Sequence, residues 1–293
     1  MKKTMTTSKT GKKKRSQWGD IWHRLCRNKL AMFGLFVLVL LVLMAVFADV
    51  IAPYGYDDQD YSQMLQFPSA AHPMGTDNFG RDIFSRIIYG TRISLQIGFI
   101  SLMGSAVVGS ILGACAGYFG GAADTVIMRG ADILMAIPRT VLAIAIATTL
   151  GPGLTNAMIA VAISSIPNFA RVVRASTLTV KEQEYVEAAR AIGASNAHII
   201  ARYIFPNVMS PIIVQATLGV GTAIILAASL SFLGLGIQPP VPEWGAMLSA
   251  SRSYMRDYWY MVTFPGLAIM LTVLALNLFG DGLRDALDPK LKK

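Results

Sequence analysis

Five long windows of this 293-residue chain contain no charged residue and consist mostly of apolar side chains. They comprise residues 30–48, 93–123, 140–170, 203–242 and 258–280. A helix that crosses the hydrocarbon core of a membrane needs about 20 such residues. The pattern therefore predicts at least five membrane-spanning helices.

The window of residues 140–170 contains a strong helix breaker, Gly151-Pro152-Gly153. Proline lacks the amide hydrogen that a helix interior requires, and glycine readily adopts turn conformations. We therefore expect this window to form two spans joined by a tight turn. The expected number of spans is six, and the expected fold class is an all-α polytopic membrane protein.

The second predicted span carries small residues on one face, because Gly109, Gly113 and Gly117 follow one another at intervals of four. Such a face lets the backbone of another helix approach closely, so we expect this span inside a helix bundle. A short connection through residues 124–132 is expected next. Pro138-Arg139 then predicts a kink or boundary where the third span begins.

Residues 179–206, with the sequence TVKEQEYVEAARAIGASNAHIIARYIFP, differ from the spans because they are charged and amphipathic. Thr179 and Glu182 have the spacing of a capping box, which predicts that a helix begins at this point. Gly193 stands where a glycine commonly terminates a helix. The pattern therefore predicts a short helix between Thr179 and Gly193.

A second short helix is expected next, with Ser195 or Asn196 as its N-cap and with Pro206 preventing a simple continuation. The first helix has a polar side and an apolar side. The polar side comprises Glu182, Glu184, Glu187 and Arg190, and the apolar side comprises Tyr185, Ala188, Ala189 and Ile192. Such a hairpin can dock against a partner outside the bilayer or can merely connect two spans, and the residues alone leave both alternatives open.

Basic residues gather on one side of the predicted membrane. The chain has 26 Lys and Arg against 17 Asp and Glu, a net charge of +9. With six spans and the N-terminus inside, twenty basic residues lie on the inner side and five on the outer side. This positive-inside pattern predicts cytoplasmic termini and places the connection through residues 124–132 in the cytoplasm. Because orientation explains the charge, no nucleic-acid partner is expected.

These patterns predict the following organisation of the chain. Residues 1–29 form a basic cytoplasmic tail with an interfacial helix, 30–52 the first transmembrane helix and 53–91 an extracytoplasmic segment. Residues 92–281 form a core of five transmembrane helices that includes the loop 179–206, and residues 282–293 form a cytoplasmic tail.

The chain lacks the residues of an energy source of its own. Its one Gly-Lys pair, Gly11-Lys12, has Thr6 where a Walker A motif requires glycine, so no P-loop can bind ATP. No Asp or Glu lies inside a predicted span, and Arg139 at a span edge is the only basic candidate. Self-sufficient ion-coupled transporters usually carry buried ionisable groups. We therefore expect no enzyme activity and no cofactor, with energy supplied by a partner.

Metal binding is not expected either. His72 has no His or Cys partner on its side of the membrane, so it is interpreted as an ordinary loop histidine. Asp58 and Asp60 begin like a calcium-binding loop, but Gln63 occupies the position that requires glycine. An acidic turn in contact with solvent is the simpler interpretation.

The amphipathic stretch resembles the EAA motif of binding-protein-dependent ABC importer permeases, E-A-A-x3-G-x9-I-x-L-P. Glu187-Ala188-Ala189, Gly193 and Pro206 occur at the matching spacing, with Tyr203 and Phe205 in place of Ile and Leu. Further segments resemble the second permease subunit of dipeptide, oligopeptide and nickel importers, over about residues 22–293. These segments are HPMGTDNFGRDIFSRIIYGTRISL, GYFGG, SLSFLGLGIQPPVPEWGAML, FPGLAI and NLFGDGLRDALDP.

The resemblance implies a type I ABC importer permease fold in which the cytoplasmic hairpin is a coupling helix that docks on an ATPase subunit. The residues implied in ATPase coupling are Glu184, Glu187, Ala188, Ala189, Gly193 and Pro206. The implied partners are a homologous permease subunit in a heterodimer, two cytoplasmic ATPase subunits, an extracytoplasmic solute-binding protein and membrane lipid. The implied location is the bacterial cell membrane.

The implied function is that of a transmembrane permease subunit in an ATP-driven importer of dipeptides or oligopeptides. Nickel and glutathione are alternative substrates within the same family, and the absence of a Cys/His cluster in the spans favours a peptide. A self-sufficient secondary transporter or channel, and a membrane scaffold that transports nothing, are alternatives of other classes. Uptake by the chain without any ATPase would support the self-sufficient transporter.

Overall fold

The computed structural model describes residues 17–287, and their secondary structure is helical. The predicted basic tail before residue 17 and the last residues of the predicted C-terminal tail lie outside the described residues. The helices are α1 (Gln17–Arg27), α2 (Lys29–Val46), α3 (Ala48–Ile51), α4 (Ile83–Phe119), α5 (Gly121–Ala136), α6 (Arg139–Leu150), α7 (Leu154–Val180), α8 (Glu184–Ala191), α9 (Asn196–Ile199), α10 (Phe205–Phe232), α11 (Trp244–Ser251) and α12 (Tyr260–Leu287).

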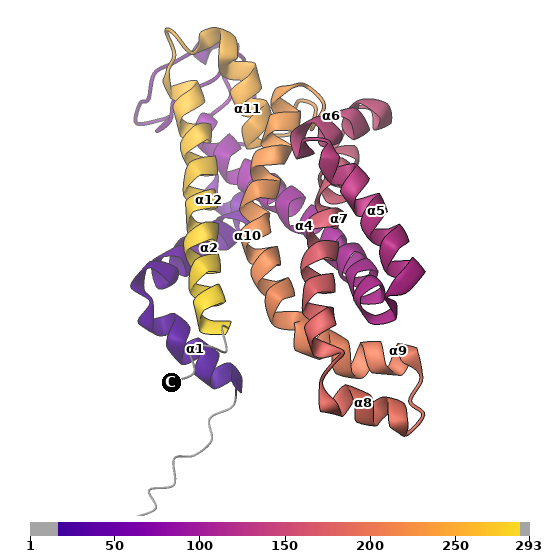
Figure 1. Cartoon of the computed structure of the whole chain (residues 1–293). Coiled ribbons are helices and arrows are strands. Elements are labelled where there is room, and N and C mark those ends of the chain that lie inside the picture. Colours follow the sequence, from indigo (N-terminus) through magenta and orange to yellow (C-terminus); the bar gives the residue numbers. More distant parts are fainter. Residues whose placement is uncertain (1–16, 288–293) are drawn as a thin grey trace, which may run out of the picture.

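Five helical segments are long and apolar enough to cross a membrane. They contain α2, α4, α7, α10 and α12, and the pair α5 and α6 makes a sixth if it is counted as one span bent by 92°. Helices α8 and α9 protrude beyond the lower end of the bundle, where α1 and the end of α12 also lie (Figure 1). We call this end of the bundle the hairpin end. The expected all-α polytopic architecture is confirmed.

The predicted connection through residues 124–132 is wrong, because these residues lie within helix α5. The acidic side chains of α5 pair with arginines of α7: Arg171 Nη2 lies 2.8 Å from Asp132 Oδ1, and Arg174 Nη2 lies 2.6 Å from Asp124 Oδ2. The acidic residues that indicated a loop therefore form ion pairs between two packed helices. The boundary predicted at Pro138-Arg139 is confirmed as the bend between α5 and α6.

The small-residue face of α4 packs against α7, as the spacing of its glycines predicted. A β-carbon at Gly109 would lie 2.7 Å from the carbonyl oxygen of Ile166, and one at Gly117 would lie 2.9 Å from that of Arg174. Such separations are too short for a side chain, so the two backbones are in direct contact. Glycine at these positions therefore permits the close approach of the two helices.

Helix α4 begins at Ile83, so the predicted extracytoplasmic segment of residues 53–91 includes its first turns. Asp82 caps the helix, because its Oδ2 accepts a hydrogen bond of 2.7 Å from the Ser85 backbone amide. At the end of the bundle opposite the hairpin end, Trp244 of α11 is fully buried. Its Nε1 donates to the Ile87 carbonyl oxygen at 3.2 Å. The start of α4 therefore supports α11 and the loops around it.

His72 is buried in this region, although the sequence predicted only an ordinary loop histidine. Its ring nitrogens lie 2.9 Å from Asp82 Oδ1 and 2.9 Å from Gln63 Oε1. Gln63 in turn donates to Asp60 at 3.0 Å, and a hydrogen bond from the Ser62 hydroxyl lowers the pKa of Asp60. These contacts tie residues 53–82 to the start of α4, so His72 has a structural role.

The packing of α4 against α7 generates a stability prediction. Gly109→Ala places a methyl group against the backbone of α7, and we expect a loss of about 1–3 kcal/mol because the helices must separate. Gly104→Ala is the matched control on the same helix, since its new β-carbon would lie 4.0 Å from the nearest atom, in Ala162. Thermal unfolding in detergent measures both variants. Equal midpoints for the two would contradict the proposed contact.

Candidate docking site

The hairpin α8–α9 is the predicted functional element, and the structure places it beyond the ends of α7 and α10 (Figure 1). Helix α8 begins at Glu184 and not at the predicted capping box, because α7 continues through Thr179 to Val180. The last turn of α7 is held against α4, since Lys181 Nζ donates to the Gly117 carbonyl oxygen at 3.0 Å. Packing between two spans therefore overrides the local capping signal.

Gly193 ends helix α8, as predicted. Its φ is +78°, a left-handed conformation that glycine adopts without steric cost. The Ala194 amide donates to the Ala189 carbonyl oxygen at 3.1 Å, and the Gly193 amide donates to that of Arg190 at 2.9 Å. This pair of bonds is a Schellman motif, which closes the carbonyl end of α8 and reverses the chain.

Ser195 is the N-cap of α9, as predicted, because its Oγ accepts from the His198 amide at 3.3 Å. Pro206 does not end the helical segment, but the continuation is not a simple one: α9 passes through a π-helical turn, Ile200–Ile204, into α10. The missing proline amide falls in the first turn of α10, where the wider turn has already shifted the hydrogen bonds. Residues Asn196–Phe232 therefore form one helical segment of 37 residues.

The buried side of α8 differs from the predicted apolar side. Val186 and Ala189 are buried and pack with Ile199 and Ile204 in a cluster at the ends of the spans. Of the four predicted apolar residues only Ala189 is buried. The spacing of Val186 and Ala189, three residues apart, was the signal in the sequence that could have identified this face.

The exposed side of α8 faces away from the bundle. It comprises Glu184, Tyr185, Glu187, Ala188, Ala191 and Ile192. Tyr185 is 41% exposed and Ile192 is 81% exposed, which leaves apolar surface beside the carboxylates. A mixed apolar and acidic patch on a protruding helix suits a protein partner.

The hairpin is also fastened to the end of α4. The Tyr118 hydroxyl donates to Asn196 Oδ1 at 2.9 Å, and the Arg190 guanidinium lies over the Tyr118 ring, 5.0 Å from its centroid. A Glu187–Arg190 ion pair, the purely structural alternative for these residues, is not formed within residues 17–287. Glu187 is consequently left on the exposed side, while Arg190 anchors the helix.

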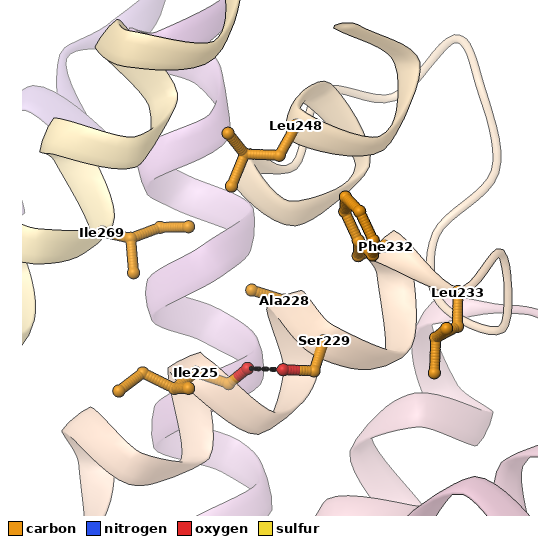
Figure 2. A pocket seen from close by; sticks show the side chains of 7 residues that line it. All are labelled: Ile225, Ala228, Ser229, Phe232, Leu233, Leu248 and Ile269. Carbon is orange, nitrogen blue, oxygen red and sulfur yellow. Dashed lines mark hydrogen bonds between the residues drawn. The ribbon is translucent and has the colours of Figure 1, made fainter. Parts of the chain in front are cut away.

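A second candidate site is an open hollow of about 400 Å³ between α10, α11 and α12 (Figure 2). Its lining is apolar apart from Ser229, whose hydroxyl donates to the Ile225 carbonyl oxygen at 2.8 Å. The hollow therefore offers no free polar group to orient a charged ligand. Such a surface suits apolar side chains or lipid chains. In the described part of the chain, no three His, Cys, Asp or Glu residues gather as a metal site.

Comparison with known families identifies the family to which the chain belongs. Residues 106–293 match the family described as the binding-protein-dependent transport system inner membrane component. Residues 16–68 match the N-terminal TM domain of oligopeptide transport permease C. The chain belongs to this ABC permease family. It is therefore a multi-pass permease component of a binding-protein-dependent ABC transporter, which implies ATPase and binding-protein partners, and it is not itself an ATPase.

Relatives named for different substrates are equally similar to this permease. A dipeptide transport system permease protein, DppC of Alkalihalophilus pseudofirmus, is 51% identical over 277 residues, covering 94% of this chain and 91% of the relative. A glutathione transport system permease protein, GsiD of Pectobacterium atrosepticum, is 51% identical over 280 residues, covering 95% and 93%. The Escherichia coli GsiD is 50% identical over 279 residues, covering 95% and 92%.

A solved chain of the inward-facing MetNI methionine ABC transporter has the same fold. Its TM-score is 0.57 at 18% sequence identity, and the match covers 69% of this permease and 96% of that chain. The match supports the ABC importer permease architecture of the bundle.

The anchoring of the hairpin generates a second prediction. Tyr118→Phe removes the hydrogen bond to Asn196 but keeps the ring under Arg190. We expect amide hydrogen exchange in α8 and α9 to accelerate roughly fivefold, since one hydrogen bond contributes about 1 kcal/mol. Tyr185→Phe is the control, because it removes a hydroxyl from the exposed side of α8. Unchanged exchange in Tyr118→Phe would show that the bond does not hold the hairpin.

Proposed function

We propose that this permease is a subunit of an ATP-driven importer of dipeptides or oligopeptides, and that its hairpin transmits movement from the ATPase subunits. One observation carries this proposal. A short helix with an exposed apolar and acidic side projects from the bundle, while its other side is fixed to the spans. Glu184, Glu187 and Ala188 would contact the ATPase, and Ala189, Gly193 and Pro206 would hold the hairpin in shape.

The continuous helical segment from α9 into α10 supports a lever mechanism. A partner that moves α8 and α9 would displace Asn196–Phe232 as one body, because no break separates the hairpin from the span. The contacts of Tyr118 with Arg190 and Asn196 would carry the same displacement to α4. ATP-driven closure of two ATPase subunits would thereby switch the pathway between inward-facing and outward-facing states.

A homologous permease subunit would complete the translocation pathway as a heterodimer with this chain. The apolar hollow between α10, α11 and α12 supports this arrangement, because exposed Ile225, Phe232 and Leu233 would be covered by a second bundle or by lipid. An external solute-binding protein would deliver the substrate at the end that carries α11. Glutathione and nickel are the alternative substrates, and competition in an uptake assay distinguishes them from dipeptides.

The orientation in a bacterial cell membrane rests on the distribution of basic residues. We propose that the hairpin end is cytoplasmic, with both termini on the same side. Cys26 in α1 is exposed and allows a direct measurement. With Cys115 replaced by alanine, a membrane-impermeant maleimide should label Cys26 in inverted vesicles but not in intact cells.

The matched control for this labelling is Ala70→Cys in a chain without other cysteines, since Ala70 is exposed at the opposite end. It should be labelled in intact cells. Labelling of Cys26 from outside would reverse the proposed topology.

Coupling is tested at Gly193. Gly193→Val forces a β-branched residue to φ +78°, which strains the end of α8 by an amount on the order of 1–2 kcal/mol or more. In vesicles that contain the whole transporter, we expect dipeptide uptake to fall at least about tenfold while ATP hydrolysis continues. Radiolabelled uptake and phosphate release measure the two activities.

Gly193→Asn is the control for this substitution, because asparagine tolerates the left-handed conformation and no atom lies within 4 Å of the new β-carbon. It should retain coupling. Normal uptake in Gly193→Val would contradict the transmission role of the hairpin. Uptake of glutathione or nickel in place of dipeptides by the unaltered transporter would reassign the substrate and leave the coupling result intact.

A further inference from the structure

Arg139 is a half-buried cation at the bend where α5 gives way to α6. Its side chain reaches α7 and α10: Nη2 donates to Ser165 Oγ at 2.6 Å and Nη1 donates to Thr222 Oγ1 at 3.3 Å. Both hydroxyls donate in turn to carbonyl oxygens of their own helices, those of Val161 and Gly219, at 2.6 and 2.8 Å. The hydroxyls therefore orient the guanidinium but leave its charge uncompensated.

Within residues 17–287, no carboxylate forms an ion pair with Arg139. Its Nε is buried and has no hydrogen-bond acceptor among these residues. A guanidinium carries five N–H donors, and the described structure supplies acceptors for only two of them. Arg171 and Arg174, by contrast, each pair with an aspartate of α5.

The start of helix α6 adds positive potential at the same place. Pro138 is its N-cap and has no side-chain group that could accept from the first amides. Those amides and the helix dipole favour an anion, and the Arg139 guanidinium has the same sign. Like charges that face one place without a counter-ion are costly, so both features point to an anionic ligand.

The residues that hold Arg139 lie well inside their spans, away from the ends that face α11. Ser165 lies about 16 Å along α7 from Leu154, and Thr222 lies about 15 Å along α10 from Phe232, at 1.5 Å per residue. These positions are near the middle of a hydrocarbon core about 30 Å thick. Ionisable residues at such depth mark substrate pathways, and broken helices there present their N-termini to anionic substrate groups.

We propose that Arg139, oriented by Ser165 and Thr222 and supported by the N-terminus of α6, binds a carboxylate of the transported substrate. The free N–H donors of the guanidinium suit two parallel hydrogen bonds to carboxylate oxygens. The identification of the ligand as a substrate rests on the proposed import of peptides, each of which has a C-terminal carboxylate. The site would hold this group while the pathway changes between its two states.

The test uses the whole transporter in lipid nanodiscs, without ATP and without the binding protein. Equilibrium binding is measured with alanyl-phenylalanine, with its C-terminal amide and with glutarate as a plain carboxylate. We expect the free acid to bind more tightly than the amide, and Arg139→Gln to abolish this preference with a loss of about tenfold or more in affinity for both acids. Arg139→Lys should retain part of the preference, because it keeps the charge but not the fork of donors.

Arg252→Gln is the matched control, since Arg252 is an exposed arginine directly after α11. It should leave all three affinities unchanged. An unchanged preference in Arg139→Gln would overturn the proposal, and so would the absence of any carboxylate binding by the unaltered transporter. Dissociation of the second permease from Arg139→Gln would overturn it as well, because the counter-charge would then belong to that subunit.

Uptake of alanyl-phenylalanine by the unaltered transporter in vesicles is measured in parallel. If uptake is absent while glutarate binding still depends on Arg139, the proposed peptide substrate fails and the carboxylate site stands. If uptake is present while binding does not depend on Arg139, the carboxylate site fails and the proposed function stands.

Discussion

The direct contact between the backbones of α4 and α7 is the constraint on which much of this permease depends. The glycine face of α4 removes the side chains that would hold the two helices apart. Once α7 lies against α4, its arginines can reach the aspartates of α5, and Lys181 can reach the end of α4. One close contact between spans thus positions both the bent helix pair and the base of the hairpin.

The hairpin combines a rigid attachment with a free surface. Its buried residues belong to the same cluster as the ends of α4, α7 and α10, and its exposed residues face away from the bundle. A partner that binds the exposed side would act on three spans together, because no flexible connection intervenes between α9 and α10. The same bundle holds Arg139 between α7 and α10, so movement of these helices would change the surroundings of the proposed carboxylate site.

The sequence by itself determined the features that depend on local chemistry or on simple patterns. Long windows without charge indicated the spans, because a membrane excludes unpaired charges from its apolar core. The spacing of glycines indicated a closely packed face on α4, and Gly193 indicated the end of α8, since a left-handed residue is needed there. Arg139 was recognised only as a basic residue at a span edge.

The tertiary structure decided the features that depend on neighbours distant in sequence. Residues 124–132 lie in a helix whose Asp124 and Asp132 pair with arginines of α7, and no local pattern reveals these partners. The hairpin begins at Glu184 because α4 holds the last turn of α7, and Pro206 is accommodated by a π-helical turn. The surroundings of Arg139 depend likewise on tertiary structure, because Ser165 of α7 and Thr222 of α10, both distant in sequence, are its hydrogen-bond partners and neither carries a charge.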